Sequence, residues 1–391
     1  MSRAEQPVWT FNAGSSSIKC AIFVGERACV LAQVEALGTS PRLMLGENPP
    51  ESLAAATTTH AQALEALLHA LSAQGYDLAN AYAVGHRLVH GGTAFQKPVL
   101  IDAEALSLLN PLRKLAPLHN GYGLDIIEYL LTQQPTLRQI ACFDTAFHAT
   151  LPDTAVRFAL PERYYARGYR RFGFHGINYE YLSEELRASG APKRVLAFHL
   201  GNGCSIAAIN DHVSVATTMG YSTLDGLIMG TRTGSIDPGL LISLLRDEGL
   251  SLAQLEQLLY REAGLLGLSG LSNDMRRLES SSEPAAQRAI EHFVMQAARQ
   301  AAALVPMLGG VDALVFSGGI GFGSATVRAR IVALLAFLGF QIEPNNNATR
   351  AVRIEAAGHS KPIYVIAANE EKMLSRHVYR ILDQHRTSVS K

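Results

Sequence analysis

Two strand-like patterns enclose a run of small residues in Val8-Trp-Thr-Phe-Asn-Ala-Gly-Ser-Ser-Ser-Ile-Lys-Cys-Ala-Ile-Phe-Val24. The apolar residues on either side favour extended chain, whereas Asn12 to Ser17 favours a turn. A closely similar unit recurs in Val195-Leu-Ala-Phe-His-Leu-Gly-Asn-Gly-Cys-Ser-Ile-Ala-Ala-Ile209, with its turn at 201–203. Each unit predicts a β-hairpin, and the recurrence predicts a duplicated fold with one copy per domain.

Segments outside the hairpins indicate an α/β protein. Leucines at helical spacing predict a helix that stops near Gly75, and a strand at 81–84 leads into Gly85-His-Arg87. A long helix around Phe293 precedes a strand at 313–316, and the Pro- and Gly-rich segment 40–52 is expected to be a loop. We expect the boundary between two domains near residues 145–150. We expect residues 1–146 with 371–391 to form the first domain, and residues 147–370 to form the second.

Composition excludes several classes of protein. The 391 residues carry a formal net charge of zero, so a broad basic surface for nucleic acid or anionic lipid is not expected. Four cysteines (Cys20, Cys29, Cys142 and Cys204) form no CxxC pair, which argues against a zinc site or a disulfide framework. Residues 1–8 show no apolar signal core, and no run approaches the roughly 18 apolar residues that a membrane span needs, so neither a signal segment nor a membrane span is expected. A cytoplasmic protein without membrane partners is therefore predicted.

Glycine-rich segments follow three of the predicted strands, and each is expected to be a turn. Glycine lets backbone N–H groups approach a phosphate closely, and serine adds hydroxyl donors. The first segment offers Gly14, Ser15 and Ser17, with Lys19 as a nearby cation. The second is Gly201-Asn202-Gly203, and the third is Ser317-Gly-Gly-Ile-Gly321. None matches the Walker or the dinucleotide-binding pattern, so the phosphate site is predicted to be of another type.

Eight ordered motifs resemble those of the acetate kinase family and together span nearly the whole chain. They are Asn12-Ala-Gly-Ser-Ser-Ser-Ile-Lys19, Gly85-His-Arg-Leu-Val-His-Gly-Gly92, Ala116-Pro-Leu-His-Asn120, Phe143-Asp-Thr-Ala-Phe-His148, Arg171-Phe-Gly-Phe-His-Gly176, His199-Leu-Gly-Asn-Gly203, Met229-Gly-Thr-Arg232 and Asn369-Glu-Glu371. The resemblance implies the two-domain, ribonuclease H-like fold of sugar kinases, Hsp70 and actin. It also implies an ATP cleft between the domains, a C-terminal helix packed on the first domain, and a homodimer formed through the second.

The implied reaction is reversible transfer of the γ-phosphoryl group of ATP to acetate, giving acetyl phosphate and ADP. A carboxylate nucleophile is already ionised at pH 7, so the site needs cations and hydrogen-bond donors and no general base. The resemblance carries catalytic roles to Arg87, Arg232, His175, Asp144 and, secondarily, His119. In this scheme the arginines clamp the carboxylate and the phosphoryl group, and Asp144 positions the metal shell or Arg232.

The resemblance also assigns the binding residues. Mg²⁺, or Mn²⁺ in its place, is expected at Glu370 and Asn12. The phosphates and adenosine of ATP are expected at Asn12, Ser15, Ser17, Lys19, His199, Asn202, Gly203, Asp274, Met275, Arg276, Gly318, Gly319 and Ile320. The carboxylate is expected at Arg87, and the alkyl end of the substrate at Val89, Leu118, Phe174 and Thr223. His86, His90 and His148 are expected to be structural.

Three departures from the family pattern leave alternatives open. Phe322-Gly323 stands where the family usually has Glu-Asn, and Ser235 replaces an aspartate after the arginine motif. The usual His-Gly-Thr-Ser-His becomes His175-Gly-Ile-Asn-Tyr179. Within the enzyme class, a propionate or butyrate kinase is the alternative, and a pyrophosphate-dependent kinase is less favoured. From other classes, a nucleotide-gated binding protein and a catalytically degenerate nucleotide-binding regulator remain.

Overall fold

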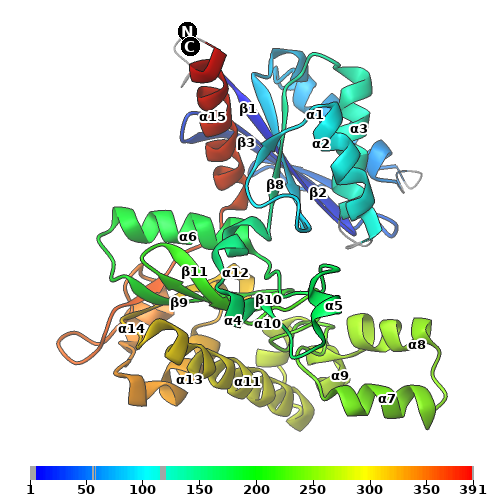
Figure 1. Cartoon of the computed structure of the whole chain (residues 1–391). Helices are drawn as coiled ribbons and strands as arrows, with labels where there is room; N and C mark the ends of the chain where they lie inside the picture. The colour runs from blue at the N-terminus through cyan, green and yellow to red at the C-terminus, as the bar shows by residue number, and fades with distance from the viewer. Residues whose placement is uncertain (1–5, 55–56, 58, 115–119, 390–391) are drawn as a thin grey trace. The chain divides into compact units, whose positions relative to one another are not determined.

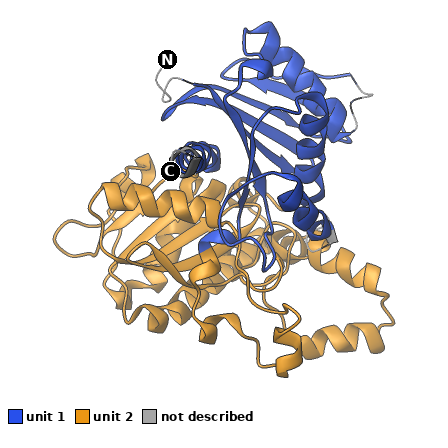
Figure 2. Ribbon diagram, turned by 45° about the horizontal axis from the view of Figure 1, so that its top comes forward, with its two compact units in different colours: residues 1–147, 369–391 blue, residues 148–368 orange. Residues whose placement is uncertain are grey.

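Two β-sheets form the framework of the chain, each within its own compact unit. The computed structural model describes residues 6–54, 57, 59–114 and 120–389. Unit 1 comprises residues 1–147 and 369–391, and unit 2 comprises residues 148–368 (Figure 2). None of the helices in the described part of the chain has the length and apolar character needed to cross a membrane.

Unit 1 contains an eight-stranded sheet in the order β5-β4-β3-β2-β1-β6-β8-β7. Its strands are β1 (Val8–Gly14), β2 (Ser17–Val24), β3 (Arg27–Glu35), β4 (Arg42–Leu45), β5 (Glu51–Ser52), β6 (Ala83–Leu88), β7 (Val99–Leu100) and β8 (Gln139–Phe143). Its helices are α1 (His60–Ala73), α2 (Ala103–Leu109), α3 (Asn120–Gln133) and α15 (Glu370–Val389). Short 3₁₀ turns are η2 (Leu78–Asn80), η3 (Asn110–Lys114) and, at the unit boundary, η4 (Ala146–Thr150).

Helices cover both faces of this sheet. In Figure 1, α1 and α3 lie on one side of the sheet and α15 lies on the other. α1 begins with a capping box between Thr59 and Gln62, and its leucines join Phe11 and Ile18 in a buried core. On the other face, a Cβ on Gly85 would lie 2.9 Å from Val378 of α15. Glycine at this position therefore lets α15 pack closely against β6.

Unit 2 contains a five-stranded sheet in the order β11-β10-β9-β12-β13. Its strands are β9 (Arg194–Leu200), β10 (Cys204–Asn210), β11 (Val213–Thr217), β12 (Ala313–Ser317) and β13 (Ile363–Val365). Its longer helices are α6 (Gly176–Ala188), α7 (Pro238–Arg246), α11 (Pro284–Leu308) and α13 (Ala325–Leu334). Shorter helices are α4 (Asp153–Val156), α5 (Glu162–Tyr165), α8 (Leu252–Gln257), η5 (Leu258–Glu262), α9 (Gly264–Ser269), α10 (Met275–Glu279), α12 (Gly318–Gly323), η6 (Ala336–Leu338) and α14 (Pro344–Thr349). α6 and α11 lie on opposite sides of this sheet (Figure 1).

The two sheets repeat one topology. In unit 1, β3, β2 and β1 are antiparallel neighbours, and β6 and β8 continue the sheet in parallel with β1. In unit 2, β11, β10 and β9 are antiparallel neighbours, and β12 and β13 continue in parallel with β9. The duplicated fold predicted from the two hairpins is confirmed, as are the helix before Gly75 and the long helix around Phe293.

Three local predictions were wrong. The expected loop 40–52 contains β4 and β5, because this segment pairs with the edge of β3 despite its prolines. The third glycine-rich segment is not a turn: residues after Ser317 form α12 at once, since Gly318 adopts a φ of 77° beside the carbonyl of Leu200. β6 runs to Leu88, so Gly85-His-Arg87 belongs to the strand itself.

Candidate functional site

Three neighbouring strands of unit 1 bring polar residues to one face of the sheet. β1, β6 and β8 run parallel, with Thr10 beside Gly85 and Arg87 beside Cys142. Side chains alternate between the faces of a sheet. Asn12, two residues after Thr10, and Asp144, two residues after Cys142, therefore emerge on the same face as Arg87.

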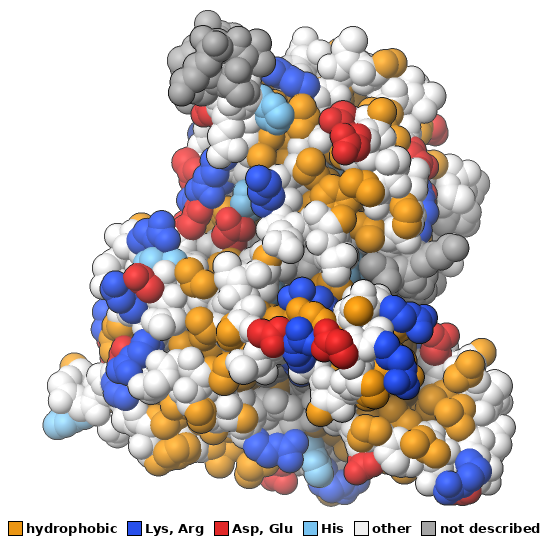
Figure 3. Space-filling model, in the orientation of Figure 1, with side chains coloured by type: hydrophobic (Ala, Val, Ile, Leu, Met, Phe, Trp, Pro, Cys, Tyr) orange, Lys and Arg blue, Asp and Glu red, His pale blue; other side chains and the backbone are white. Residues whose placement is uncertain are grey.

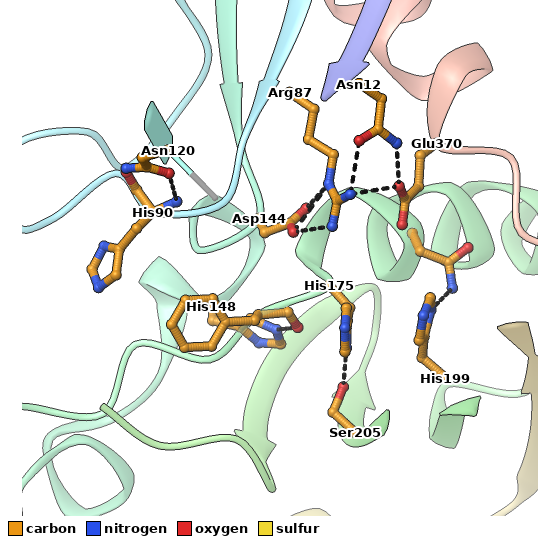
Figure 4. Close-up of polar contacts among 12 residues, drawn as sticks. Asn12, Arg87, His90, Asn120, Asp144, His148, His175, His199, Ser205 and Glu370 are labelled. Carbon is orange, nitrogen blue, oxygen red and sulfur yellow. Dashed lines mark hydrogen bonds and ion pairs between the residues drawn. The ribbon is translucent and has the colours of Figure 1, made fainter. Parts of the chain in front are cut away.

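Arg87 is held on every side by these neighbours (Figure 4). Its Nη2 donates to Asp144 Oδ2 at 2.6 Å, and its Nε lies 3.1 Å from the same oxygen. Its Nη1 donates to Asn12 Oδ1 at 2.9 Å and lies 3.4 Å from Glu370 Oε2. Asn12 Nδ2 donates to that Glu370 oxygen at 3.1 Å. The guanidinium therefore has a fixed orientation.

The C-terminal helix supplies Glu370 by simple helix geometry. Glu370, Leu374 and Val378 are spaced four residues apart, so they lie along one stripe of α15. Leu374 and Val378 pack over Gly85, on the sheet face that Arg87 shares. Glu370, the first residue of the helix, therefore lies beside the guanidinium of Arg87, which is two residues after Gly85 in β6.

The charges in this cluster compensate one another. Burial alone would lower the pKa of Arg87, but the carboxylates of Asp144 and Glu370 hold that pKa above its ordinary value. Asp144 is 1% exposed and is bound bidentately, so it is a poor candidate for a general base. Among the described residues, no group of three or more His, Cys, Asp or Glu side chains is placed to hold a metal ion.

In unit 2, the glycine turn between β9 and β10 brings three of the predicted motifs together. A Cβ on Gly203 would lie 2.9 Å from His175 Nε2 and 3.2 Å from Arg232 Nη2. A Cβ on Gly230 would lie 2.6 Å from Asn202 Oδ1. Both glycines are therefore required for these polar groups to approach so closely.

Arg232 differs from Arg87 in its electrostatic surroundings. Its Nη1 donates to the carbonyl oxygen of Thr223 at 2.7 Å, and no carboxylate within the described residues forms an ion pair with it. Burial lowers the pKa of Arg232, and the charge of Arg261 acts in the same direction. A desolvated cation with this environment favours the arrival of an anion.

His175 occupies a special backbone position beside this turn. It is the N-cap of α6 and has a φ of 59°, a left-handed conformation that a non-glycine residue adopts at a cost of about 1 kcal/mol or more. Its Nδ1 lies 2.8 Å from Ser205 Oγ, and its ring stacks on His199 with centroids 4.1 Å apart. Strain of this kind is common at functional sites.

A hollow of about 550 Å³ in unit 2 contains the predicted adenosine residues. This volume suits a small-molecule ligand. Its predicted lining residues are Asn202, Asp274, Met275, Arg276, Gly319 and Ile320. It is also lined by residues that were not predicted: Gly201, Asn273, Glu279, Gly323 and Ser324. Gly318 is buried against Leu200 and is not among the residues that line the hollow. Its left-handed backbone conformation instead lets α12 begin directly after β12.

The remaining predicted residues are scattered over both units. Ser15 and Lys19 are exposed, and Ser17 is partly exposed, at the tip of the first hairpin. Lys19 pairs with Asn12 across β1 and β2. Val89 follows β6 in unit 1 and Phe174 precedes α6 in unit 2, and both are buried. Thr223 offers its backbone carbonyl to Arg232. Leu118 and His119 lie outside the described residues.

Three polar neighbours of the histidines were missed. Ser205, Asn178 and Tyr179 are buried and hydrogen-bonded around His175 and His199. Asn178 and Tyr179 had been noted as departures from the family pattern, without a contact being assigned to either. The sequence contained a signal for Ser205, because the register of a tight hairpin places it opposite His199.

His86, His90 and His148 are buried, and burial lowers the pKa of each to about 4.

The topology repeated in the two sheets and the nucleotide-sized hollow are those expected of a kinase with the sugar kinase, Hsp70 and actin fold. A sequence profile of the Acetokinase family matches residues 8–376. An acetate kinase of Nitrobacter hamburgensis is 41% identical over 97% of this chain and 97% of its own. An acetate kinase of Rhodopseudomonas palustris is 40% identical over 95% and 97%. The chain belongs to the Acetokinase family.

Solved structures agree with this assignment. A propionate kinase from Francisella tularensis superimposes with a TM-score of 0.89 at 35% identity, covering 95% of this chain and 98% of its own. The acetate kinase of Porphyromonas gingivalis superimposes with a TM-score of 0.87 at 32% identity, covering 96% and 100%. The fold class predicted from sequence is therefore confirmed.

Proposed function

We propose that this chain catalyses reversible transfer of the γ-phosphoryl group of ATP to acetate, giving acetyl phosphate and ADP. The observation that carries the choice of acetate is the near-full-length similarity to acetate kinases at about 40% identity. The geometry supports the reaction type, because unit 2 combines a nucleotide-sized hollow with an arginine that has no carboxylate partner among the described residues.

The chemistry of the site fits direct transfer to a carboxylate. Acetate is ionised at neutral pH and attacks without losing a proton, so a general base is unnecessary. Asp144 is committed to Arg87, in agreement with that requirement. Catalysis then consists of holding the reactants and compensating negative charge on the transferring phosphoryl group.

The residues divide this work as follows. Arg87, fixed by Asp144 and Asn12, binds the carboxylate in a constant orientation. Arg232 and His175, which converge beside Gly203, stabilise the oxygens of the phosphoryl group in the transition state. Asn202 and the backbone of residues 201–203 hold the phosphate chain, and the hollow holds the nucleoside.

A divalent metal is compatible with unit 1. Mg²⁺ is usually held by one or two carboxylates, waters and substrate phosphates, and seldom by a cage made of protein alone. Glu370 supplies a carboxylate and Asn12 an amide, side by side, which fits that donor set. When bound, Mg²⁺ would supply charge compensation for the phosphates.

The chain is also proposed to act in the cytoplasm as a homodimer formed through unit 2. Leu240 and Ile242 of α7 and Leu252 of α8 are 48%, 58% and 72% exposed. Hydrophobic side chains gather over this region in Figure 3, and exposed apolar clusters often mark protein interfaces. Light scattering should give twice the chain mass of 42.1 kDa; a single-chain mass would exclude the dimer.

A hydroxamate assay tests the function directly. Purified protein with ATP, Mg²⁺, acetate and hydroxylamine should yield acetyl hydroxamate, and omission of ATP or acetate should abolish it. Parallel reactions with propionate and butyrate separate the enzyme alternatives. Nucleotide binding without any acyl hydroxamate would identify a catalytically degenerate regulator and reject the proposal.

A further inference from the structure

A row of three polar residues crosses the sheet of unit 2 on the face covered by α6. Ser205 of β10 pairs with His199 of β9, and His199 pairs with Ser317 of β12. Paired residues on neighbouring strands point to the same face. Ser205 and Ser317 are fully buried, so their hydroxyl groups need partners.

The first turn of α6 meets this row with three side chains. His175, Asn178 and Tyr179 are separated by three and four residues, which places them on one side of the helix. Tyr179 Oη lies 2.6 Å from Ser205 Oγ, and Ser205 Oγ lies 2.8 Å from His175 Nδ1. Asn178 Nδ2 lies 2.9 Å from His199 Nδ1. Each histidine is therefore bonded at Nδ1, and Figure 4 shows both of these contacts.

The direction of the first chain follows from the donors available. Burial raises the pKa of the Tyr179 phenol, so that group keeps its proton at all ordinary pH values. The phenolic proton can then be donated to Ser205 Oγ, which leaves the serine proton for His175 Nδ1.

The second chain is set by an amide. In the orientation that the structure gives this amide, Asn178 Nδ2 faces both His199 Nδ1 and Ser317 Oγ, and Asn178 Oδ1 is buried without a hydrogen-bond partner among the described residues. Because an amide nitrogen only donates, His199 Nδ1 accepts in this orientation. A neutral imidazole with an accepting Nδ1 carries its proton on Nε2. The two rings are stacked at 4.1 Å beside the turn that also contacts Arg232, and additional positive charge on both rings would be unfavourable there.

We propose that Tyr179 and Asn178 are positioning residues that hold His175 and His199 as neutral Nε2–H tautomers. Each ring then presents a fixed N–H donor on the edge opposite its bonded nitrogen. For His175 this edge faces Gly203, where a Cβ would lie 2.9 Å from Nε2. The expected effect on turnover rests on the proposed function, in which that donor meets the transferring phosphoryl group.

The tautomers can be measured without turnover. Protein labelled with ¹⁵N-histidine is studied by long-range ¹H–¹⁵N correlation, with His175→Gln and His199→Gln used to assign the two rings. Wild-type protein should show an unprotonated Nδ1 and a protonated Nε2 at both residues. A protonated Nδ1 in either wild-type ring would overturn the proposal for that ring, whatever the enzyme assay shows.

Variants test the assigned cause. Tyr179→Phe should mix the His175 tautomers and lower kcat roughly tenfold to a hundredfold, with KM values within about threefold. Asn178→Asp replaces the donor by an acceptor and should transfer the His199 proton to Nδ1. Tyr181→Phe removes a hydroxyl from another side of α6 and serves as the control. If Tyr179→Phe does not fold, Ser205→Ala tests the same relay.

The outcomes separate this inference from the proposed function. The expected tautomers with no acetyl hydroxamate from wild-type protein would reject the function and retain the positioning role. If wild-type protein forms acetyl hydroxamate but the tautomers are unchanged in both Tyr179→Phe and Asn178→Asp, the function is retained and the positioning role is rejected. A kcat loss equal to that of Tyr181→Phe would show that the effect of Tyr179 is structural.

Discussion

Two arginines that the sequence made equivalent candidates differ in the structure. Arg87 in unit 1 contacts Asp144 and Glu370, which hold its pKa above the ordinary value. Arg232 in unit 2 is bonded to a backbone carbonyl, and burial lowers its pKa. One cation is compensated by the protein, whereas the other lacks a carboxylate partner within the described residues.

The difference separates orientation from charge compensation. A guanidinium with a bidentate carboxylate partner has a fixed plane, and its charge is already compensated. It therefore orients a bound substrate more than it attracts one. A desolvated guanidinium without such a partner gains most when an anion arrives, and its attraction is strongest where water is excluded. We therefore expect Arg232 to matter chiefly to the transition state, and Arg87 to matter also to the stability of unit 1.

Arg232→Ala gives the largest expected effect on activity. Removing this cation should lower kcat by on the order of 10³-fold or more, as for other arginines in phosphoryl transfer. Its unfolding free energy should change little, because no ion pair with a described carboxylate is broken. The hydroxamate assay and thermal unfolding measure both. Arg246→Ala, at an exposed arginine of α7, is the control. Near-normal kcat in a folded Arg232→Ala protein would remove the proposed role.

Arg87→Ala tests the expected contribution of Arg87 to the stability of unit 1. We expect a similar loss of kcat, and also a loss of about 3 kcal/mol in unfolding free energy, because Asp144 is left buried without its cation. The double variant Arg87→Ala/Asp144→Ala should regain most of the stability and none of the activity. Arg113→Ala removes two more exposed ion pairs, with Asp125 and Glu128, and should cost only about 1 kcal/mol or less. Equal stability of Arg87→Ala and Arg232→Ala would contradict the distinction.

Much of the fold could be predicted because it depends on local patterns. The two hairpins, the helix before Gly75 and the helix around Phe293 all follow from residue type and spacing. The strands β4 and β5 could not be predicted in the same way. They are short, and Leu43 is their only buried residue; they form because the edge of β3 is available for pairing.

Motif resemblance gave the candidate residues of the site, but it did not give the contacts among them. Motif resemblance singled out Arg87, Asp144 and Glu370, but the expectation that Asp144 positions the metal shell or Arg232 did not include its pairing with Arg87. That pairing depends on the parallel register of β6 and β8. The helix α12 could not be predicted either, because a glycine-rich segment favours a turn. A helix of only six residues is stabilised by tertiary packing and not by its own sequence.

Gly203→Ala tests whether the close approach of His175 and Arg232 to this glycine is needed for activity. The added methyl carbon would lie 2.9 Å from His175 Nε2 and 3.2 Å from Arg232 Nη2, so one or both groups must move. A displacement of this size at a catalytic group should lower kcat on the order of 10²-fold. Gly121→Ala, where a Cβ meets nothing within 4 Å, is the matched control. Equal kcat values for the two alanine variants would show that this approach is unimportant.

Glu370→Ala removes one of the two carboxylates near Arg87 and leaves Asp144 in place. Because Glu370 and Asn12 fit the donor set of Mg²⁺, half-maximal activity should require about tenfold more Mg²⁺, or activity should be lost. A Mg²⁺ titration of the hydroxamate assay measures this. Glu371→Ala changes the next carboxylate on α15 and should leave the curve nearly unchanged. Superimposable curves for wild type and Glu370→Ala would exclude the metal role.

Val89→Ala probes the alkyl end of the substrate and has the smallest expected effect. Val89 is buried two residues beyond Arg87, so in extended chain the two side chains lie on the same side. A carboxylate bound to the guanidinium would direct its alkyl end away from the charge, and Val89 is the proposed contact for that end. One methylene in an apolar pocket is worth about 1–3 kcal/mol, or roughly 10–200-fold in specificity. Wild-type protein should therefore prefer acetate to propionate by about tenfold or more in kcat/KM.

Val89→Ala should narrow this ratio of kcat/KM values chiefly by improving the use of propionate, while acetate loses some packing. Leu100→Ala, at a partly buried apolar residue of β7, controls for general loosening of unit 1. If the wild-type protein uses propionate as well as acetate, the propionate kinase alternative takes over; if the ratio is the same in Val89→Ala, the pocket lies elsewhere.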